Sequence, residues 1–366
     1  MARPKIAVVL GTRPEAVKLA PVLLALRRNR GADVRVVLTG QHESLVPPVL
    51  SFFGLRADED LRSMRAGQTP GEAAGRILER LDPWLRRERP GRVVVQGDTV
   101  SALAAAQAAF FAGIPVAHVE AGLRTFDFRD PFPEEACRTL ISKIADLHFA
   151  PTPGASANLR AEGVPARGIR VVGNPVLDAL EFARSRPRPA PPPPAPSVGD
   201  VILFTCHRRE NFGAPMLRVL GALRRIARRH PETPVVFPVH PNPEVSGPAR
   251  LLAGEPGIVL VSPLSYPVLT RLLERARLVM TDSGGLQEES SWLGRPVVIL
   301  REKTERPELV EAGGAVLAGT DPDRIEAEAE RILSDPRVRS RMARPRRLFG
   351  DARSGPRIAR YLVGGH

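Results

Sequence analysis

Apolar residues gather along this chain in short continuous runs, and longer amphipathic segments separate them. The first run, Lys5-Ile-Ala-Val-Val-Leu10, has no alternating polar face, which is typical of a strand buried on both faces of a parallel sheet. Gly11-Thr-Arg-Pro-Glu15 follows, and Pro14 suits the first turn of a helix that we predict to reach about Arg28. The pattern then repeats, with predicted strands at 34–38, 93–95, 115–119, 147–150 and 169–172 and helices at 43–53, 71–87, 100–112 and 134–144.

A second alternating set begins after a Pro-rich stretch at 185–196, which we interpret as a stiff surface spacer. Alternation of this kind predicts an α/β fold with doubly wound sheets and a ligand crevice beyond the carboxyl ends of the strands. We therefore predict two Rossmann-like domains that face each other across a cleft. The first covers 1–172 and is joined by the C-terminal helix 355–366, and the second covers 173–354. In the second we predict strands at 201–204, 235–239, 258–261, 277–280 and 294–300 and helices at 214–229, 266–275, 286–293 and 322–333, with one more ending near 253.

Length, charge and cysteine content narrow the class of protein. The 366 residues are enough for two domains of ordinary size. No apolar run approaches the roughly 18 residues of a membrane span and no signal peptide precedes the first strand, so we expect a cytoplasmic protein. Cys137 and Cys206 are too few for a disulfide scaffold. The net charge is +13, but basic residues are spread along the chain and aromatic residues are only 5%, so we expect attraction of polyanions such as nucleotide diphosphates and no nucleic-acid partner.

One stretch, Thr281-Asp-Ser-Gly-Gly-Leu-Gln-Glu-Glu289, joins a predicted strand to a predicted helix. Ser283 can cap this helix, and Gly284 and Gly285 let the backbone approach a ligand closely. The N–H groups and positive dipole end of such a helix start favour phosphate. Glu289 lies about one and a half turns into the helix, where its carboxylate can accept a ribose hydroxyl. An ordinary strand–turn–helix with a capping serine would show the same pattern.

Three acidic residues of the first half follow strands or open a helix. Asp98 ends the run from Val93, Glu120 ends the run from Val116, and Glu134 opens the helix predicted at 134–144. Carboxylates at the carboxyl edge of a parallel sheet point into its crevice, where burial and like charges raise their pKa towards working pH. These residue types therefore suit general acid/base catalysis, although helix caps or exposed acids would fit each position too.

Basic side chains are predicted at the same edges. Arg13 and Lys18 lie on the helix that follows the first strand. His207 ends a strand of the second half beside two arginines, where phosphate can bind, and a purely structural histidine is the alternative. Arg306 follows a strand and precedes a predicted helix.

The sequence lacks motifs for metals and for common cofactors. His118-Val-Glu120 matches half of a zinc deaminase signature, but the Pro-Cys-x-x-Cys half is absent, so we expect no metal. No Gly-x-Gly-x-x-Gly follows the first strand and no P-loop occurs, so we expect no cofactor. The pattern by itself predicts a two-domain cleft enzyme, with acids in the first domain and phosphate groups bound in the second.

A series of short motifs then narrows the prediction. They are Gly11–Ala16, Gln96–Thr99, His118–Thr125, Pro131–Glu135, Gly173–Val176, His207–Gly213, Pro238–Asn242, Thr281–Glu289 and Thr304–Glu308. In their order, and across almost the whole chain, these motifs resemble those of the non-hydrolysing UDP-N-acetylglucosamine 2-epimerases, which have a glycosyltransferase-B-like (GT-B-like) fold.

This resemblance implies the interconversion of UDP-N-acetylglucosamine (UDP-GlcNAc) and UDP-N-acetylmannosamine (UDP-ManNAc) by inversion at C2. In the family, UDP is eliminated to leave 2-acetamidoglucal and is added back with a proton on the opposite face. The family's members are usually homodimers. By matching position, the resemblance implies an acid/base set of Asp98, Glu120 and Glu134, with His207 beside the sugar and diphosphate. It implies phosphate contacts from Arg13, Ser283, Gly284 and Gly285. It also implies a ribose contact from Glu289, a sugar contact from Arg306 and a contact in the first-domain site from Lys18.

Regulation and the competing reactions stay open at this point. Many bacterial relatives bind a second substrate molecule as an activator, and Gln41 and His240 match positions linked to that role. Ser44 and Gly67, however, stand where longer polar or basic side chains are often found. A hydrolysing relative, a glycosyltransferase and a nucleotide-sugar sensor would share the predicted cleft. The motifs at 118–125 and 131–135 resemble the non-hydrolysing branch.

Overall fold

A computed structural model describes residues 3–29, 31–65, 67–187, 189–196 and 199–364. The chain divides into two compact units, one of 1–179 with 349–366 and one of 180–348. The sequence-based boundaries, 172/173 and 354/355, differ from these because helix α7 (Pro175–Arg184) begins within the first unit. There Asp178 accepts hydrogen bonds from the main-chain N–H groups of Ser354 (3.0 Å) and Gly355 (2.9 Å), which open the last helix, α15 (Ser354–Gly364).

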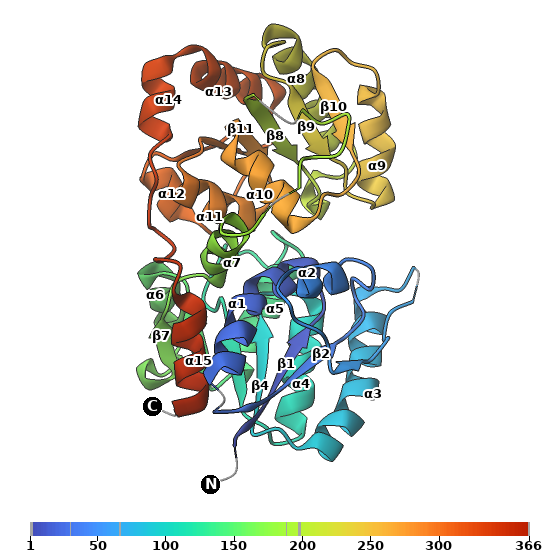
Figure 1. Cartoon of the computed structure of the whole chain (residues 1–366), viewed down its shortest axis with the longest axis vertical. Helices are drawn as coiled ribbons and strands as arrows, with labels where there is room; N and C mark the ends of the chain where they lie inside the picture. The colour runs from blue at the N-terminus through green and yellow to red at the C-terminus, as the bar shows by residue number, and fades with distance from the viewer. Residues whose placement is uncertain (1–2, 30, 66, 188, 197–198, 365–366) are drawn as a thin grey trace. The chain divides into compact units, whose positions relative to one another are not determined.

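Among the described residues, the first unit contains a seven-stranded sheet with the order β3-β2-β1-β4-β5-β6-β7 (Figure 1). All neighbouring strands are parallel, and the order reverses beside β1, as in a doubly wound sheet. The strands are β1 (Lys5–Leu10), β2 (Asp33–Leu38), β3 (Glu59–Asp60), β4 (Arg92–Gln96), β5 (Val116–Val119), β6 (Leu147–Ala150) and β7 (Ile169–Val171). The helices are α1 (Arg13–Asn29), α2 (Val46–Phe52), α3 (Pro70–Glu88), α4 (Val100–Phe111), α5 (Glu134–Ile144) and α6 (Pro153–Ala161), together with α15, which packs against α1.

The described part of the second unit contains a six-stranded parallel sheet with the order β10-β9-β8-β11-β12-β13 (Figure 1). Its strands are β8 (Val201–Thr205), β9 (Val235–Pro238), β10 (Ile258–Val261), β11 (Ala276–Thr281), β12 (Val297–Ile299) and β13 (Ala315–Leu317). Its helices are α8 (Ala214–Arg229), α9 (Pro243–Ala249), α10 (Tyr266–Glu274), α11 (Gly284–Leu293), α12 (Pro307–Glu311), α13 (Pro322–Ser334) and α14 (Pro336–Met342).

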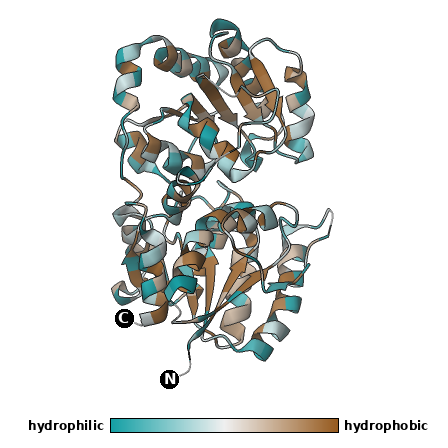
Figure 2. Cartoon of the chain, viewed as in Figure 1, coloured by the Kyte–Doolittle hydropathy of each residue, from teal (hydrophilic) through white to brown (hydrophobic). Residues whose placement is uncertain are grey.

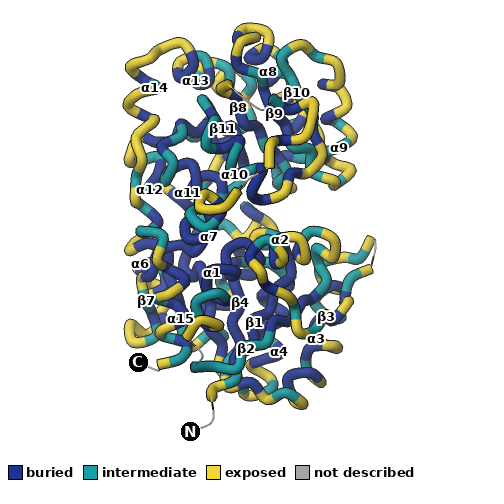
Figure 3. The backbone as a smooth tube through the Cα atoms, in the orientation of Figure 1, coloured by how far each residue is buried: buried dark blue, intermediate teal, exposed yellow. Residues whose placement is uncertain are grey.

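The apolar runs form the centre of each unit. Ile6 to Leu10 of β1 are each at most 4% exposed, and the strands of both sheets are mostly hydrophobic (Figure 2). The residues of the strands are also mostly buried, whereas exposed residues lie in the outer helices and loops of each unit (Figure 3). Both sheets therefore have the two covered faces that continuous apolar runs predict. Within the described residues, no helix has the length and apolar character needed to cross a membrane.

The Pro-rich stretch is more closely packed than a surface spacer. Pro191 and Ala195 are buried, and Ala195 belongs to an apolar cluster with Val201 and Val236 of the second sheet. The Arg275 guanidinium donates to the carbonyl of Pro196 at 2.9 Å. The described residues of this stretch are thus partly held against the second unit, because small apolar side chains between the prolines reach its core.

Candidate functional site

Glu120, directly after β5, lies at the carboxyl edge of the first sheet, and the residue is 6% exposed. Its Oε2 accepts from Lys18 Nζ at 2.5 Å and from the amide of Gln96. Its Oε1 accepts from the amide of Asn174 at 3.2 Å. The structure therefore brings the predicted Lys18 and Glu120 together as a buried ion pair, and it adds two amides to which the sequence pattern assigns no role.

A second carboxylate of this unit, that of Asp98, follows β4 and is about one quarter exposed. Arg138 of α5, almost fully buried, donates to it and also lies 3.2 Å from Glu135. Glu135 in turn accepts from the N–H groups at 125 and 126, both at 3.0 Å, and so supports the loop before α5. Glu134, the first residue of α5, is half-buried. Arg138 is a site candidate that the sequence pattern misses, and its position one turn after Glu134 is the signal that could have found it.

His118 is a structural histidine in β5. Burial lowers its pKa to about 3, so the ring is neutral at physiological pH, and its Nε2 lies 2.7 Å from the carbonyl oxygen of Gly97. The part of the chain that the structure describes contains no group of three or more His, Cys, Asp or Glu residues that could hold a metal ion.

Glu15 is a buried carboxylate that the sequence pattern does not single out. Its Oε2 accepts from the main-chain N–H groups of Gly11 and Thr12, the latter at 2.6 Å, and its Oε1 accepts from the hydroxyl of Thr99. Burial raises the pKa of Glu15 to about 7, although these hydrogen bonds lower it, and the nearby Asp98 charge raises it further. An acid in the first turn of a helix that follows a strand was the available signal.

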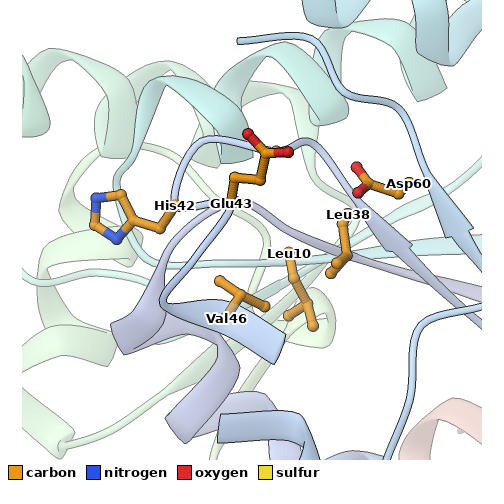
Figure 4. A pocket seen from close by; sticks show the side chains of 8 residues that line it. Leu10, Leu38, His42, Glu43, Val46 and Asp60 are labelled. Carbon is orange, nitrogen blue, oxygen red and sulfur yellow. The ribbon is translucent and has the colours of Figure 1, made fainter. Parts of the chain in front are cut away.

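The remaining predicted residues of the first unit lie near the ends of β1 and β2. Arg13 opens α1, and its N–H donates to Nδ1 of His42 at 3.2 Å. Gln41 accepts from the hydroxyl of Ser101 at 2.6 Å. A small pocket at this edge has Leu10, Leu38 and Val46 on its floor with the carboxylates of Glu43 and Asp60 beside them, while the His42 ring turns away (Figure 4). None of the predicted catalytic acids lines it.

In the second unit, Asp282 is the buried carboxylate that anchors His207. Its Oδ2 accepts from the main-chain N–H groups of His207 (2.7 Å) and Arg208 (2.8 Å) and from the amide of Asn211 (3.1 Å). Its Oδ1 lies 3.3 Å from Nδ1 of His207. Burial by itself raises the pKa of Asp282, but the His207 charge and the two N–H groups outweigh it, so this pKa is lowered. Asp282 was visible in the 281–289 stretch, yet the pattern assigns it no role.

His207 and His240 lie in the loops that follow β8 and β9, and their rings lie together. Their rings stack with centroids 5.6 Å apart and an interplanar angle of 17°. His240 accepts from the N–H of Asn242 at 3.2 Å, which fixes its ring. The residue predicted to catalyse and the residue predicted to regulate are therefore in direct contact.

The start of α11 differs in one respect from its prediction. Ser283 occupies the N-cap position, but its side chain makes no capping hydrogen bond, so this part of the prediction is wrong. Instead its N–H donates to Oγ1 of Thr281 at 2.9 Å, because the loop turns back towards the strand end. Gly285 has open space where a side chain would stand, whereas a Cβ on Gly284 would lie 2.2 Å from Nη1 of Arg306. The helix start is therefore bare backbone with a guanidinium against it.

Arg306 and Glu289 are buried and already have partners. Nε of Arg306 donates to Glu288 at 2.7 Å, and its Nη1 lies 3.4 Å from Glu305. Glu289 accepts from the hydroxyl of Tyr266 at 2.9 Å. The Arg306 guanidinium thus lies against the start of α11 and the Glu289 carboxylate lies further along the same helix, and such groups suit phosphate and hydroxyl groups respectively.

Solved structures of similar proteins define the class of enzyme. The UDP-GlcNAc 2-epimerase from Neisseria meningitidis, bound to UDP-GlcNAc, is similar with a TM-score of 0.93 and 35% identity over 99% of this chain and 100% of that chain. The enzyme from Methanocaldococcus jannaschii, in complex with UDP-GlcNAc and UDP, is similar with a TM-score of 0.87 and 33% identity over 99% and 100% of the two chains. The predicted α/β class is confirmed, and the fold is that of the GT-B-like nucleotide-sugar enzymes.

Sequence comparison defines the family. The family model described as UDP-N-acetylglucosamine 2-epimerase matches residues 24–363. The UDP-N-acetylglucosamine 2-epimerase of Yersinia pestis is 43% identical over 368 residues, which cover 98% of this chain and 98% of that protein. The chain belongs to the UDP-N-acetylglucosamine 2-epimerase family, as the motifs predict.

Proposed function

We propose that this enzyme interconverts UDP-GlcNAc and UDP-ManNAc without net hydrolysis. In the forward half, the C2–H and C1–O bonds break, a C1=C2 double bond forms, and the products are 2-acetamidoglucal, UDP and a proton. In the return half, a proton adds to the opposite face of C2 and the UDP oxygen bonds to C1. No oxidant or reductant is needed, because both halves conserve the electrons of the sugar and UDP.

The first unit supplies the acid/base groups in this proposal. Asp98, Glu120 and Glu134 exchange the C2 protons, and Lys18 keeps the Glu120 carboxylate in place. The hydrogen at C2 is not acidified by a carbonyl group, so its removal depends on charge leaving with the diphosphate. Two carboxylates that accept from two separate cations, Lys18 and Arg138, at the carboxyl edge of the sheet support this role.

The second unit stabilises the departing UDP. The bare start of α11 at 283–285 and the guanidinium of Arg306 provide N–H donors for charge that develops on the diphosphate, and His207 adds a further donor. Glu289 accepts from the ribose. Arg13 of the first unit is proposed as a further phosphate contact.

The observation that carries the proposal is the buried Glu120–Lys18 pair at the carboxyl edge of an enzyme of this family. The test is deuterium incorporation: in deuterated water, the purified enzyme places deuterium at C2 of UDP-GlcNAc, measured by proton NMR. A folded enzyme that incorporates no deuterium contradicts the elimination chemistry. Free UDP that accumulates in step with N-acetylmannosamine supports the hydrolysing reaction instead.

The acid/base assignment has its own test. Asp98→Asn and Glu120→Gln are expected to lower kcat by at least about a hundredfold while the affinity for UDP stays near that of the parent. Affinity is measured by calorimetry with UDP. Parental turnover in both variants removes these carboxylates from the mechanism.

A further inference from the structure

The two connections between the units meet inside the first unit. The chain leaves that unit after residue 179 and returns at residue 349. Close to both points, the N–H of Asn174 donates to the carbonyl of Phe349 at 2.7 Å. Gly173 and Gly350 lie against each other, since a Cβ on Gly173 would be 3.0 Å from Cα of Gly350. Both have positive φ (+87° and +120°), which glycine adopts without strain, so this meeting point is closely packed.

The side chain of Asn174 extends from this meeting point to the predicted catalytic carboxylate. Asn174 is fully buried, and its Oδ1 accepts from the N–H of Val176 at 3.1 Å. Its Nδ2 donates to Oε1 of Glu120 at 3.2 Å. Lys18 and Gln96 hold the other oxygen of that carboxylate. The two oxygens of Glu120 therefore accept hydrogen bonds from different parts of the chain. The donors to Oε2 come from α1 and the sheet, and the donor to Oε1 comes from the segment that leads out of the first unit.

We propose that Asn174 is a positioning residue for Glu120, which fixes the rotation of the carboxylate and ties it to the connections between the units. This inference rests on the acid/base role proposed for Glu120. A carboxylate held only through Oε2 can still move as the side-chain torsions of Glu120 change, whereas a second donor at Oε1 restricts those torsions and so defines the plane of the carboxylate. A base that removes the proton of one particular C–H bond needs a defined orientation, because small errors in orientation lower the reaction rate rather than the affinity for substrate.

Two substitutions at this position separate orientation from structural support. Asn174→Ala removes the donor to Glu120 and the acceptor for Val176. Asn174→Asp keeps the shape and that acceptor but directs a carboxylate oxygen at Glu120. If Asn174 only supported the helix start, the aspartate variant would be the more active of the two. The proposal gives the opposite order, because a second carboxyl group facing Glu120 either repels that carboxylate or shares a proton with it, and both change the orientation and charge of the base.

The expected result is a fall in kcat of about tenfold for Asn174→Ala and a larger fall for Asn174→Asp, with KM for UDP-GlcNAc changed by less than about threefold. Rates are measured as deuterium incorporation at C2, and folding is checked by circular dichroism. Arg357→Gln is the control, because Arg357 binds Asp351 (2.6 Å) on the same returning segment, and this variant should keep parental kcat.

The outcomes separate the two proposals. An aspartate variant at least as active as the alanine variant, or a change confined to KM, overturns the positioning role. A loss of kcat in Arg357→Gln equal to that in Asn174→Ala also overturns it, because loosening the connection would then be sufficient. If Asn174→Asp does not fold, the split between kcat and KM in Asn174→Ala decides alone. A parent enzyme that incorporates no deuterium overturns the proposed function itself, and the role of Asn174 with it.

Discussion

The replacement Glu15→Gln should change how the stability of the first unit depends on pH. Glu15 is 2% exposed and accepts hydrogen bonds from two main-chain N–H groups and the Thr99 hydroxyl. A glutamine can keep these contacts, since its oxygen can accept from both N–H groups while its amide donates to the hydroxyl, which also acts as an acceptor. The substitution therefore removes the titrating carboxyl group but keeps the shape and the hydrogen bonds of the side chain.

The direction in which the free energy of unfolding changes with pH follows from the raised pKa of Glu15. Burial raises it from 4.5 to about 7, so between these values the folded state binds more protons than the unfolded state. The free energy of unfolding therefore falls as pH rises through this window and is flat on either side. This rise in pKa corresponds to a fall of about 3 kcal/mol in the free energy of unfolding over the whole window, of which about 2.5 kcal/mol lies between pH 5 and 8. Between pH 5 and 8, the free energy of unfolding of the parent should therefore fall by about 2.5 kcal/mol relative to that of the variant.

Urea unfolding at several pH values measures this difference. Trp84, 5% exposed in the core of the first unit, reports on that unit, and a Trp292→Phe background removes the tryptophan signal of the second unit. Groups such as Asp178, whose pKa burial raises to about 6, titrate alike in both proteins and cancel in the difference. A difference between parent and variant that stays constant from pH 5 to 8 would refute the reasoning.

Glu72→Gln is the matched control for this experiment. Glu72 also lies in the first turn of a helix and accepts from the main chain, in the capping box of α3. Hydrogen bonds from Thr69 lower its pKa, so its contribution is present above about pH 4.5 and is lost only as pH falls further. Its difference from the parent should therefore not vary between pH 5 and 8.

Two further predictions concern the second unit. Gly284→Ala should raise KM for UDP-GlcNAc by about tenfold, because its Cβ would displace the guanidinium of Arg306. Gly285→Ala has open space around its new Cβ, so this variant should keep the parental Tm in a thermal melt. Tyr266→Phe should lower the free energy of unfolding by about 1–2 kcal/mol in urea, because it leaves a buried oxygen of Glu289 without its hydroxyl donor.

The sequence predicts the two sheets well because their strands are continuous apolar runs, and it is least successful with short elements. Helices α5 and α8 and strands β6 and β10 have the predicted bounds. The pattern does not predict β3, β13, α6, α7 and α14. Strand β13 has three residues, and α6 (PGASANLRA) is rich in small residues that give little apolar periodicity. Such elements form because a neighbouring surface is already there to pack on.

In the candidate site, the sequence predicts where the acidic residues lie but not which side chains they contact. Parallel topology brings the ends of neighbouring strands to one edge, so the positions of Asp98 and Glu120 follow from the pattern. Their partners do not, because the contact from Glu120 to Lys18 spans 102 residues and that from Asp98 to Arg138 spans 40. The charge state and orientation of a catalytic group depend on these partners, which sequence spacing cannot reveal.

The type of partner also separates two carboxylates that look alike in sequence. Glu120 and Asp282 each follow a buried strand and lie buried at a carboxyl edge. Asp282 accepts from the main-chain N–H groups of His207 and Arg208, which cannot move without the strand end, so it is a fixed anion that orients His207. Glu120 accepts from side chains, namely the Lys18 ammonium and the amides of Gln96 and Asn174. The two carboxylates therefore differ in their supporting atoms rather than in residue type, and the acid/base role proposed for Glu120 relies on a cation and two amides from side chains.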